Sequence, residues 1–177
     1  LHLFFAFIII SFLFWNYLNY KTQEIKIFFN FKNSLTKLLF FFILLQIILG
    51  AFVSGLDAGL IYQTWPKMNL SYFPDDLVLS NYDLVSLFSD RSFIQFLHRN
   101  VAYFIVLFVI AIGIKMYIEK KFIYFKNYLL VFSVLIIQIL LGIYTLVSGL
   151  NLYLASLHQI TSVILVFTVL KLNHNLS

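Results

Sequence analysis

Two histidines, His98 and His158, lie inside apolar stretches of the chain at matching positions. Each follows the start of its stretch by about six residues, which at 1.5 Å per helical residue places both imidazoles roughly 9 Å below one membrane face. Polar groups are costly in lipid, so each requires a reason. One membrane histidine is usually hydrogen-bonded to a neighbouring helix, whereas two at equal depth favour a shared ligand. A heme iron held by one imidazole on each side satisfies this pattern.

Other polar residues lie close to these histidines in the sequence. Arg99 is expected either to neutralise a heme propionate or to extend outward to the headgroups. Gln95 precedes His98 by three residues, on the same helical face, and is expected to line the pocket. His174 follows the last apolar stretch, 152–170, and is expected to be a solvated tail residue. Interhelical hydrogen bonds are the expected role of the remaining membrane glutamines, Gln46, Gln138 and Gln159.

The composition requires a membrane protein to hold these side chains. Of the 177 residues, 62% are hydrophobic, 20% aromatic and only 11% charged, which excludes an ordinary soluble enzyme. The absence of Cys excludes disulfides, thiolate metal sites and a thiol nucleophile. Five stretches are long enough for membrane helices, near 3–18, 38–53, 93–114, 128–147 and 152–170. The sequence therefore predicts an all-α membrane protein with five transmembrane helices, the last four forming a heme-binding bundle.

The sign of the net charge differs between successive loops that connect the predicted helices, and this pattern predicts the topology. One face carries nine Lys against two Glu, or +7, and the other carries three basic and five acidic groups, or −2, which together give the net charge of +5. The positive-inside rule places the N-terminus outside and the C-terminus inside. Because these charges follow the membrane edges without forming a groove, a lipid membrane rather than nucleic acid is the expected partner.

The long outer loop carries the densest local motif. Gly55 and Gly59 flank Asp57, which suits a sharp turn whose carboxylate caps backbone N–H groups. Tyr62 and Trp65 are expected to be interfacial anchors. Acidic and apolar residues alternate over 75–90 and predict a short amphipathic helix on the membrane surface.

Three segments together resemble heme A synthase, the membrane enzyme that makes heme A from heme O. The first is Gly50-Ala-Phe-Val-Ser-Gly-Leu-Asp-Ala-Gly, followed by Thr64-Trp-Pro-Lys-Met. The second is Gln95-Phe-Leu-His-Arg-Asn-Val-Ala-Tyr. The third is Leu141-Gly-Ile-Tyr-Thr-Leu, followed by Leu154-Ala-Ser-Leu-His-Gln. Their order and spacing agree with the family, and Gly-Leu-Asp-Ala-Gly is the most specific of these motifs.

The resemblance implies an architecture of eight helices in two four-helix halves. Residues 1–20 resemble the fourth helix, the last of the first half. A basic inner loop follows at 21–37. Residues 38–177 resemble the complete second half, including a long outer loop at 54–92.

The resemblance also implies the roles of individual residues. His98 and His158 resemble the axial pair of a heme b cofactor, with Gln95 and Arg99 beside it. His2 resembles a ligand of the substrate heme in the first half. In that half a Glu lies three residues before the His, where this chain has Gln95, so no catalytic residue is assigned here.

The implied reaction is oxidation of a methyl group of heme O to the formyl group of heme A. We expect this chain to supply the heme b half, with a partner chain carrying the missing N-terminal half. Heme O synthase or an electron-transfer protein are further expected partners. Two alternatives are a b-type electron carrier and a structural membrane subunit without heme A chemistry. A transporter is the weaker third, since no broken helix with an inward charge is visible.

The first residue, Leu1, is compatible with a fragment, a processed chain or an unusual start codon. Abundant Phe, Ile, Leu, Tyr, Asn and Lys with scarce Gly and Pro suggest an AT-rich coding genome. An organellar gene, and hence the mitochondrial inner membrane, is therefore favoured over a bacterial cytoplasmic membrane.

Overall fold

The computed structural model describes residues 2–28, 34–77 and 83–177, and five long helices dominate it. All five are long and apolar enough to cross a membrane, which confirms the predicted fold class. They are α1 (His2–Thr22), α2 (Ser34–Gly55), α4 (Arg91–Ile118), α5 (Phe125–Val147) and α6 (Leu152–Leu176). Short elements connect them: η1 (Ala58–Leu60), α3 (Leu84–Leu87) and η3 (Phe122–Tyr124). The described residues contain no strand, only the isolated bridge between Met68 and Ser71.

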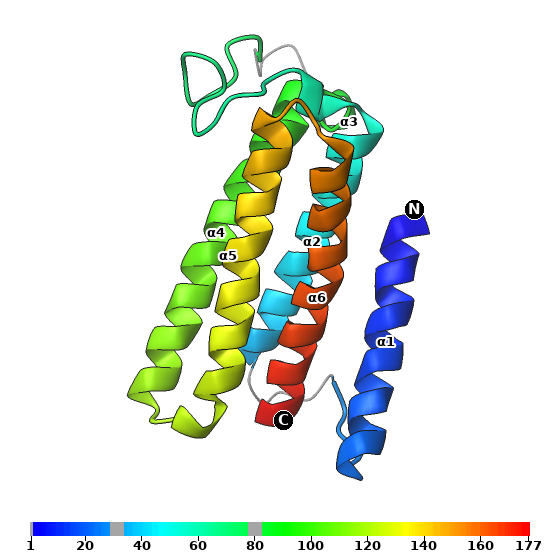
Figure 1. The fold of residues 1–177 in the computed structure, drawn as a ribbon, viewed down its shortest axis with the longest axis vertical. Coiled ribbons are helices and arrows are strands. Elements are labelled where there is room, and N and C mark those ends of the chain that lie inside the picture. The colour runs from blue at the N-terminus through cyan, green and yellow to red at the C-terminus, as the bar shows by residue number, and fades with distance from the viewer. Residues whose placement is uncertain (1, 29–33, 78–82) are drawn as a thin grey trace.

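Four of the helices form a bundle, and the first lies beside it (Figure 1). Helix α2 packs on α4, α5 packs on α6, and α2 also contacts α6. The buried core takes one apolar stripe from each helix, with Leu39, Ile105, Val131 and Val166 almost fully buried. Helix α1 packs mainly against α6, where the rings of Phe14 and Phe167 stack with their centroids 4.2 Å apart.

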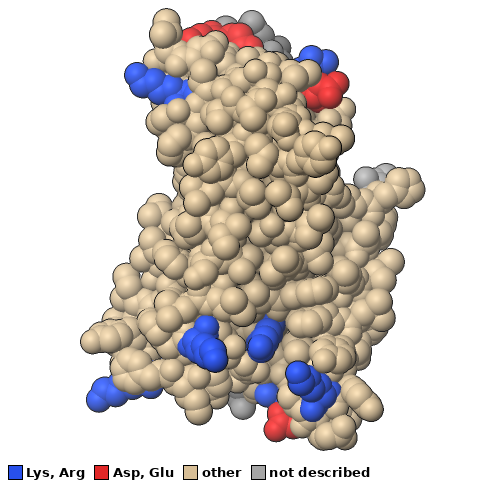
Figure 2. All heavy atoms as spheres, in the orientation of Figure 1, with Lys and Arg blue, Asp and Glu red and all other residues tan. Residues whose placement is uncertain are grey.

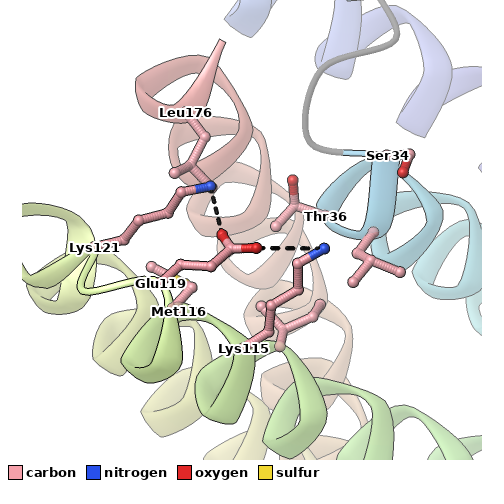
Figure 3. A pocket seen from close by; sticks show the side chains of 9 residues that line it. Ser34, Thr36, Lys115, Met116, Glu119, Lys121 and Leu176 are labelled. Carbon is pink, nitrogen blue, oxygen red and sulfur yellow. Dashed lines mark ion pairs between the residues drawn. The ribbon is translucent and has the colours of Figure 1, made fainter.

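The charged side chains separate to the two ends of the bundle. Figure 2 shows Lys and Arg around the end where α4 turns into α5, and acidic side chains mostly at the opposite end of the face in view. At the basic end, the Glu119 carboxylate pairs with Lys121 at 2.8 Å and with Lys115 at 3.6 Å. These residues line a cavity of about 210 Å³ between α2, α4 and α6 (Figure 3). This arrangement matches the charge asymmetry expected from the sequence.

Two segment boundaries differ from those expected. Helix α2 begins at Ser34, so the connection predicted at 21–37 is shorter and Lys37 lies buried in the first turn of the helix. The amphipathic helix predicted over 75–90 contains only the single turn α3 among the described residues, and residues 78–82 of that prediction lie outside them.

The prediction that His174 is a solvated tail residue is wrong. Helix α6 continues to Leu176, beyond the apolar stretch 152–170, and α1 covers this end, leaving His174 only 1% exposed. Its Nε2 lies 3.0 Å from Asn19 Oδ1, and the ring of Trp15 packs edge-on against it at 5.2 Å. The ammonium of Lys26 donates to the His174 carbonyl at 2.9 Å. This inner latch, made of Trp15, Asn19, Lys26 and His174, ties the C-terminal end of α1 and the residues after it to the C-terminal end of α6.

Candidate functional site

Helix caps fix the depth of the two membrane histidines. The carboxylate of Asp90 accepts from Phe93 N at 2.8 Å and begins α4, and the side chain of Asn151 accepts from Tyr153 N at 3.0 Å and begins α6. His98 lies eight residues after its cap and His158 seven after its own, so both face the same level of the bundle. Both imidazoles are half-buried.

A glutamine of α2 holds His98 at two points. Gln46 Nε2 donates to the His98 carbonyl at 2.9 Å, and the same nitrogen lies 3.3 Å from the ring Nε2. The expected interhelical hydrogen bond of Gln46 is therefore present, and its partner is the candidate ligand itself.

The same arrangement recurs between α5 and α6. Gln138 Nε2 donates to the His158 carbonyl at 3.0 Å and lies 3.4 Å from the ring Nε2. Here the ring makes one further contact, because His158 Nδ1 lies 3.0 Å from the backbone carbonyl of Gln138. The imidazole is thus tied to α5 on both of its nitrogens.

A glycine one turn after each glutamine makes room for the ring. A Cβ built on Gly50 would lie 3.3 Å from His98 Cε1, and one built on Gly142 would lie 2.9 Å from His158 Cε1. Each imidazole therefore packs against bare backbone of the neighbouring helix. Sequence reasoning did not identify this shared Gln-x-x-x-Gly pattern, although Gln-Ile-x-Leu-Gly occurs in both helices, at 46–50 and 138–142.

Gln95 and Arg99 lie under the outer loop and hold its backbone. Gln95, only 3% exposed, donates to the Tyr62 carbonyl at 2.9 Å. Arg99 donates to the same carbonyl at 3.0 Å and to the Lys67 carbonyl at 3.4 Å, so it does not extend to the headgroups. His2, the third histidine singled out from the sequence, begins α1 with its side chain exposed.

Unpartnered polar atoms gather at this site. Six buried side-chain N or O atoms of the described residues have no hydrogen-bond partner, and one of them, Asn173 Oδ1, lies near the C-terminal end of α6, away from His98 and His158. The other five are Gln46 Oε1, Gln95 Oε1, His98 Nδ1, Arg99 Nε and Gln138 Oε1. Each such atom costs about 1–3 kcal/mol, and folded proteins leave few of them. Two imidazoles and a guanidinium whose Nε has no partner fit an iron-containing, carboxylate-bearing group such as heme.

The outer loop is closed by a carboxylate. Asp76 accepts from Tyr62 Oη at 2.5 Å and from Ser92 Oγ at 2.6 Å. Partial burial alone would raise the pKa of Asp76, but the hydrogen bonds from Ser92 and Tyr62 outweigh it and hold this pKa below its usual range. Tyr62 is only 4% exposed, so the prediction that it anchors in the interface is wrong.

The turn around Asp57 also differs from expectation. Asp57 adopts the left-handed conformation at φ 52°, as a sharp turn requires, but its carboxylate makes no capping hydrogen bond to η1. Trp65, the second expected anchor, is partly exposed and donates to Tyr103 Oη at 2.9 Å.

Asp76→Ala is expected to reduce the free energy that holds the loop on α4 by about 1 kcal/mol, because it leaves the buried Tyr62 hydroxyl without its acceptor. The loss is no larger because the Asp76 carboxylate is itself exposed to solvent. Since the pKa of Asp76 is lowered on folding, its contribution is complete above the unfolded pKa of about 3.9 and is lost as pH falls through the folded value. Limited proteolysis across pH should show faster cleavage of the variant at neutral pH and no difference at the acid extreme. Asp75→Ala, at the exposed neighbour, is the control, and equal cleavage of both variants would contradict the assignment.

Comparison with known proteins places the chain in a family. The family model described as "cytochrome oxidase assembly protein" matches residues 1–170. The chain is 44% identical over 117 residues to heme A synthase of Pelagibacter ubique, and this match covers 64% of the chain and 33% of that relative. It is 37% identical over 119 residues to heme A synthase of Wolbachia pipientis wMel, and this match covers 65% of the chain and 34% of that relative. No solved structure matches the chain.

The matched stretch spans about a third of the length of these curated relatives. The relative from Flavobacterium psychrophilum, 34% identical over 117 residues, gives the same proportion. The family model nevertheless extends over nearly the whole chain, from α1 into the last turns of α6. The chain is therefore a membrane protein that belongs to the heme A synthase family of cytochrome oxidase assembly proteins.

Proposed function

We propose that this chain supplies the heme b half of a heme A synthase, with His98 and His158 as the axial ligands. The observation that carries this proposal is the duplicated unit in which a glutamine and a glycine of one helix hold a histidine of the next. Two equivalent imidazoles at one depth suit the two faces of a single porphyrin. Bound heme would supply a redox centre inside the membrane.

Arg99 and Gln95 would complete the outer side of that heme site. The Nε atom of Arg99 is buried without a partner, although both terminal nitrogens donate to loop carbonyls. A propionate reaching this guanidinium would satisfy it with a charge-assisted hydrogen bond. Gln95 holds the loop over the same region through its hydrogen bond to the Tyr62 carbonyl.

The substrate half is proposed to come from another polypeptide. Among the relatives named as heme A synthases, the chain matches only about a third of the length. We propose that the partner brings the remaining helices and the catalytic acid. His2 would then approach the substrate, heme O. The assembled enzyme would oxidise a methyl group of heme O to a formyl group. The outward face of α1, with Phe5, Ile9 and Phe12 exposed, is available to those helices.

The proposed location is the mitochondrial inner membrane, with the N-terminus of the chain outside and its C-terminus inside. Heme O synthase or an electron-transfer protein are proposed as further partners. The basic end of the bundle supports this orientation. The relatives compared here are bacterial, so a bacterial cytoplasmic membrane is the alternative location.

Expression in a synthase-deficient host tests the proposal. The chain alone should bind one low-spin, six-coordinate heme b and make no heme A, whereas co-expression with a polypeptide carrying the missing helices should restore heme A. Heme A production by the chain alone would overturn the split-enzyme proposal. One bound heme b with no heme A in either arm would favour the b-type electron carrier instead.

A further inference from the structure

We propose that the side chain of Gln46 and the backbone carbonyl of Gln138 are positioning groups, which hold the imidazoles of His98 and His158 in the iron-binding tautomer before heme arrives. The inference rests on the proposed function only for the identity of the ligand. The hydrogen bonds that carry it belong to this chain alone. They are made by two helices that each present the same Gln-x-x-x-Gly pattern to a histidine.

The orientation of each glutamine amide is fixed by the backbone. Gln46 Nε2 lies 2.9 Å from the His98 carbonyl oxygen and Gln138 Nε2 lies 3.0 Å from that of His158. A carbonyl oxygen only accepts hydrogen bonds, so the amide NH₂ group, not the amide oxygen, must face it. The same NH₂ nitrogen is the atom beside each imidazole Nε2.

This orientation determines which imidazole nitrogen carries the proton. An amide NH₂ only donates, so a neutral imidazole beside it must offer the lone pair of Nε2 and carry its proton on Nδ1. That tautomer leaves on Nε2 the lone pair that an iron atom would take. When heme binds, iron would replace the weak contact to the amide, while the amide keeps its hydrogen bond to the histidine carbonyl and so keeps the helices in register.

The two units differ in one respect that makes the proposal testable. His158 Nδ1 lies 3.0 Å from the Gln138 backbone carbonyl, which fixes the same tautomer independently of the glutamine side chain. His98 Nδ1 is buried with no hydrogen-bond partner, so the Gln46 amide alone selects its tautomer. Removal of the amide should therefore change His98 and spare His158.

His174 provides an internal reference of the opposite kind. Its Nε2 faces Asn19 Oδ1 at 3.0 Å, while Asn19 Nδ2 donates to the Lys26 carbonyl, so Oδ1 is the acceptor. His174 must therefore carry its proton on Nε2. The chain holds only four histidines, so nitrogen NMR can resolve each of them.

The experiment is nitrogen-15 NMR of the full chain in lipid nanodiscs without heme, with labelled histidine assigned through His98→Ala and His158→Ala. In the wild-type protein, His98 and His158 should both be protonated on Nδ1, and His174 on Nε2. Gln46→Met, which keeps the size but removes the amide, should shift His98 toward Nε2 protonation, whereas Gln138→Met should leave His158 unchanged. Gln159→Met, at the exposed glutamine beside His158, is the control and should change neither.

A heme titration of the same proteins gives the second measurement. Gln46→Met should weaken heme binding by about 10- to 100-fold, the usual effect of removing a partner that orients a metal ligand. Nε2 protonation of His98 in the wild-type protein, or an unchanged His98 tautomer in Gln46→Met, would overturn the inference even if heme binds. Wild-type protein that shows the expected tautomers but binds no heme would instead overturn the proposed function. If Gln46→Met does not fold, the wild-type tautomers alone decide.

Discussion

His98→Ala and His158→Ala will each abolish the low-spin, six-coordinate heme spectrum of the purified chain. Either change leaves iron with one imidazole at most, so the remaining heme becomes five-coordinate and is retained weakly. The loss should exceed the roughly 100-fold that follows removal of a partner merely orienting a ligand. The double variant should carry no heme at this site. Absorption spectra and the ratio of heme to protein after purification measure both effects.

His2→Ala is the matched control for this experiment. His2 is also a histidine near a helix start, but its side chain is exposed on α1. Its replacement should leave the stoichiometry of this heme unchanged. A wild-type spectrum in either His98→Ala or His158→Ala would show that the axial ligands lie elsewhere.

Gly142→Ala should damage the site almost as severely as loss of His158. The added methyl carbon would lie 2.9 Å from His158 Cε1, closer than atoms in contact allow. The ring has little freedom to move, because its Nδ1 and its own carbonyl are both bound to Gln138. Overpacking of this kind costs about 1–3 kcal/mol, and here it would be relieved by turning the imidazole out of place. Heme content and thermal unfolding of the apo-protein measure the two consequences.

Two other glycines of the helices provide comparison variants for that prediction. At Gly50 the added carbon would lie 3.3 Å from His98 Cε1, so Gly50→Ala should give a milder loss of heme. At Gly55, the last residue of α2, nothing lies within 4 Å, so Gly55→Ala should retain full heme. If Gly142→Ala retains heme as well as Gly55→Ala does, the close packing of ring on backbone does not shape the site.

The membrane helices could be predicted from the sequence because length and apolarity decide whether a segment spans lipid. The depth of His98 and His158 also followed from the sequence, since both depend on local helix starts. What the sequence did not reveal was which helix faces which. The partners of Gln46 and Gln138 depend on tertiary packing, and only the repeated Gln-Ile-x-Leu-Gly pattern hinted that the two units are alike.

Two of the wrong predictions share one physical cause. His174 and Tyr62 were assigned to solvent and to the lipid interface from their position in the sequence. Each is buried by a segment distant from it, α1 in one case and the folded outer loop with Asp76 in the other. Asp57 differs from both, because the expected sharp turn is present but the carboxylate makes no capping hydrogen bond.

The inner latch has a consequence for biogenesis. Lys26 meets the carbonyl of a residue 148 positions later, and Asn19 meets His174 across 155 positions. During synthesis α1 is therefore made well over a hundred residues before α6, the helix on which it docks. It must stay in the lipid, or against the insertion machinery, until α6 has been translated. Mutations in the latch should therefore act on maturation rather than on chemistry.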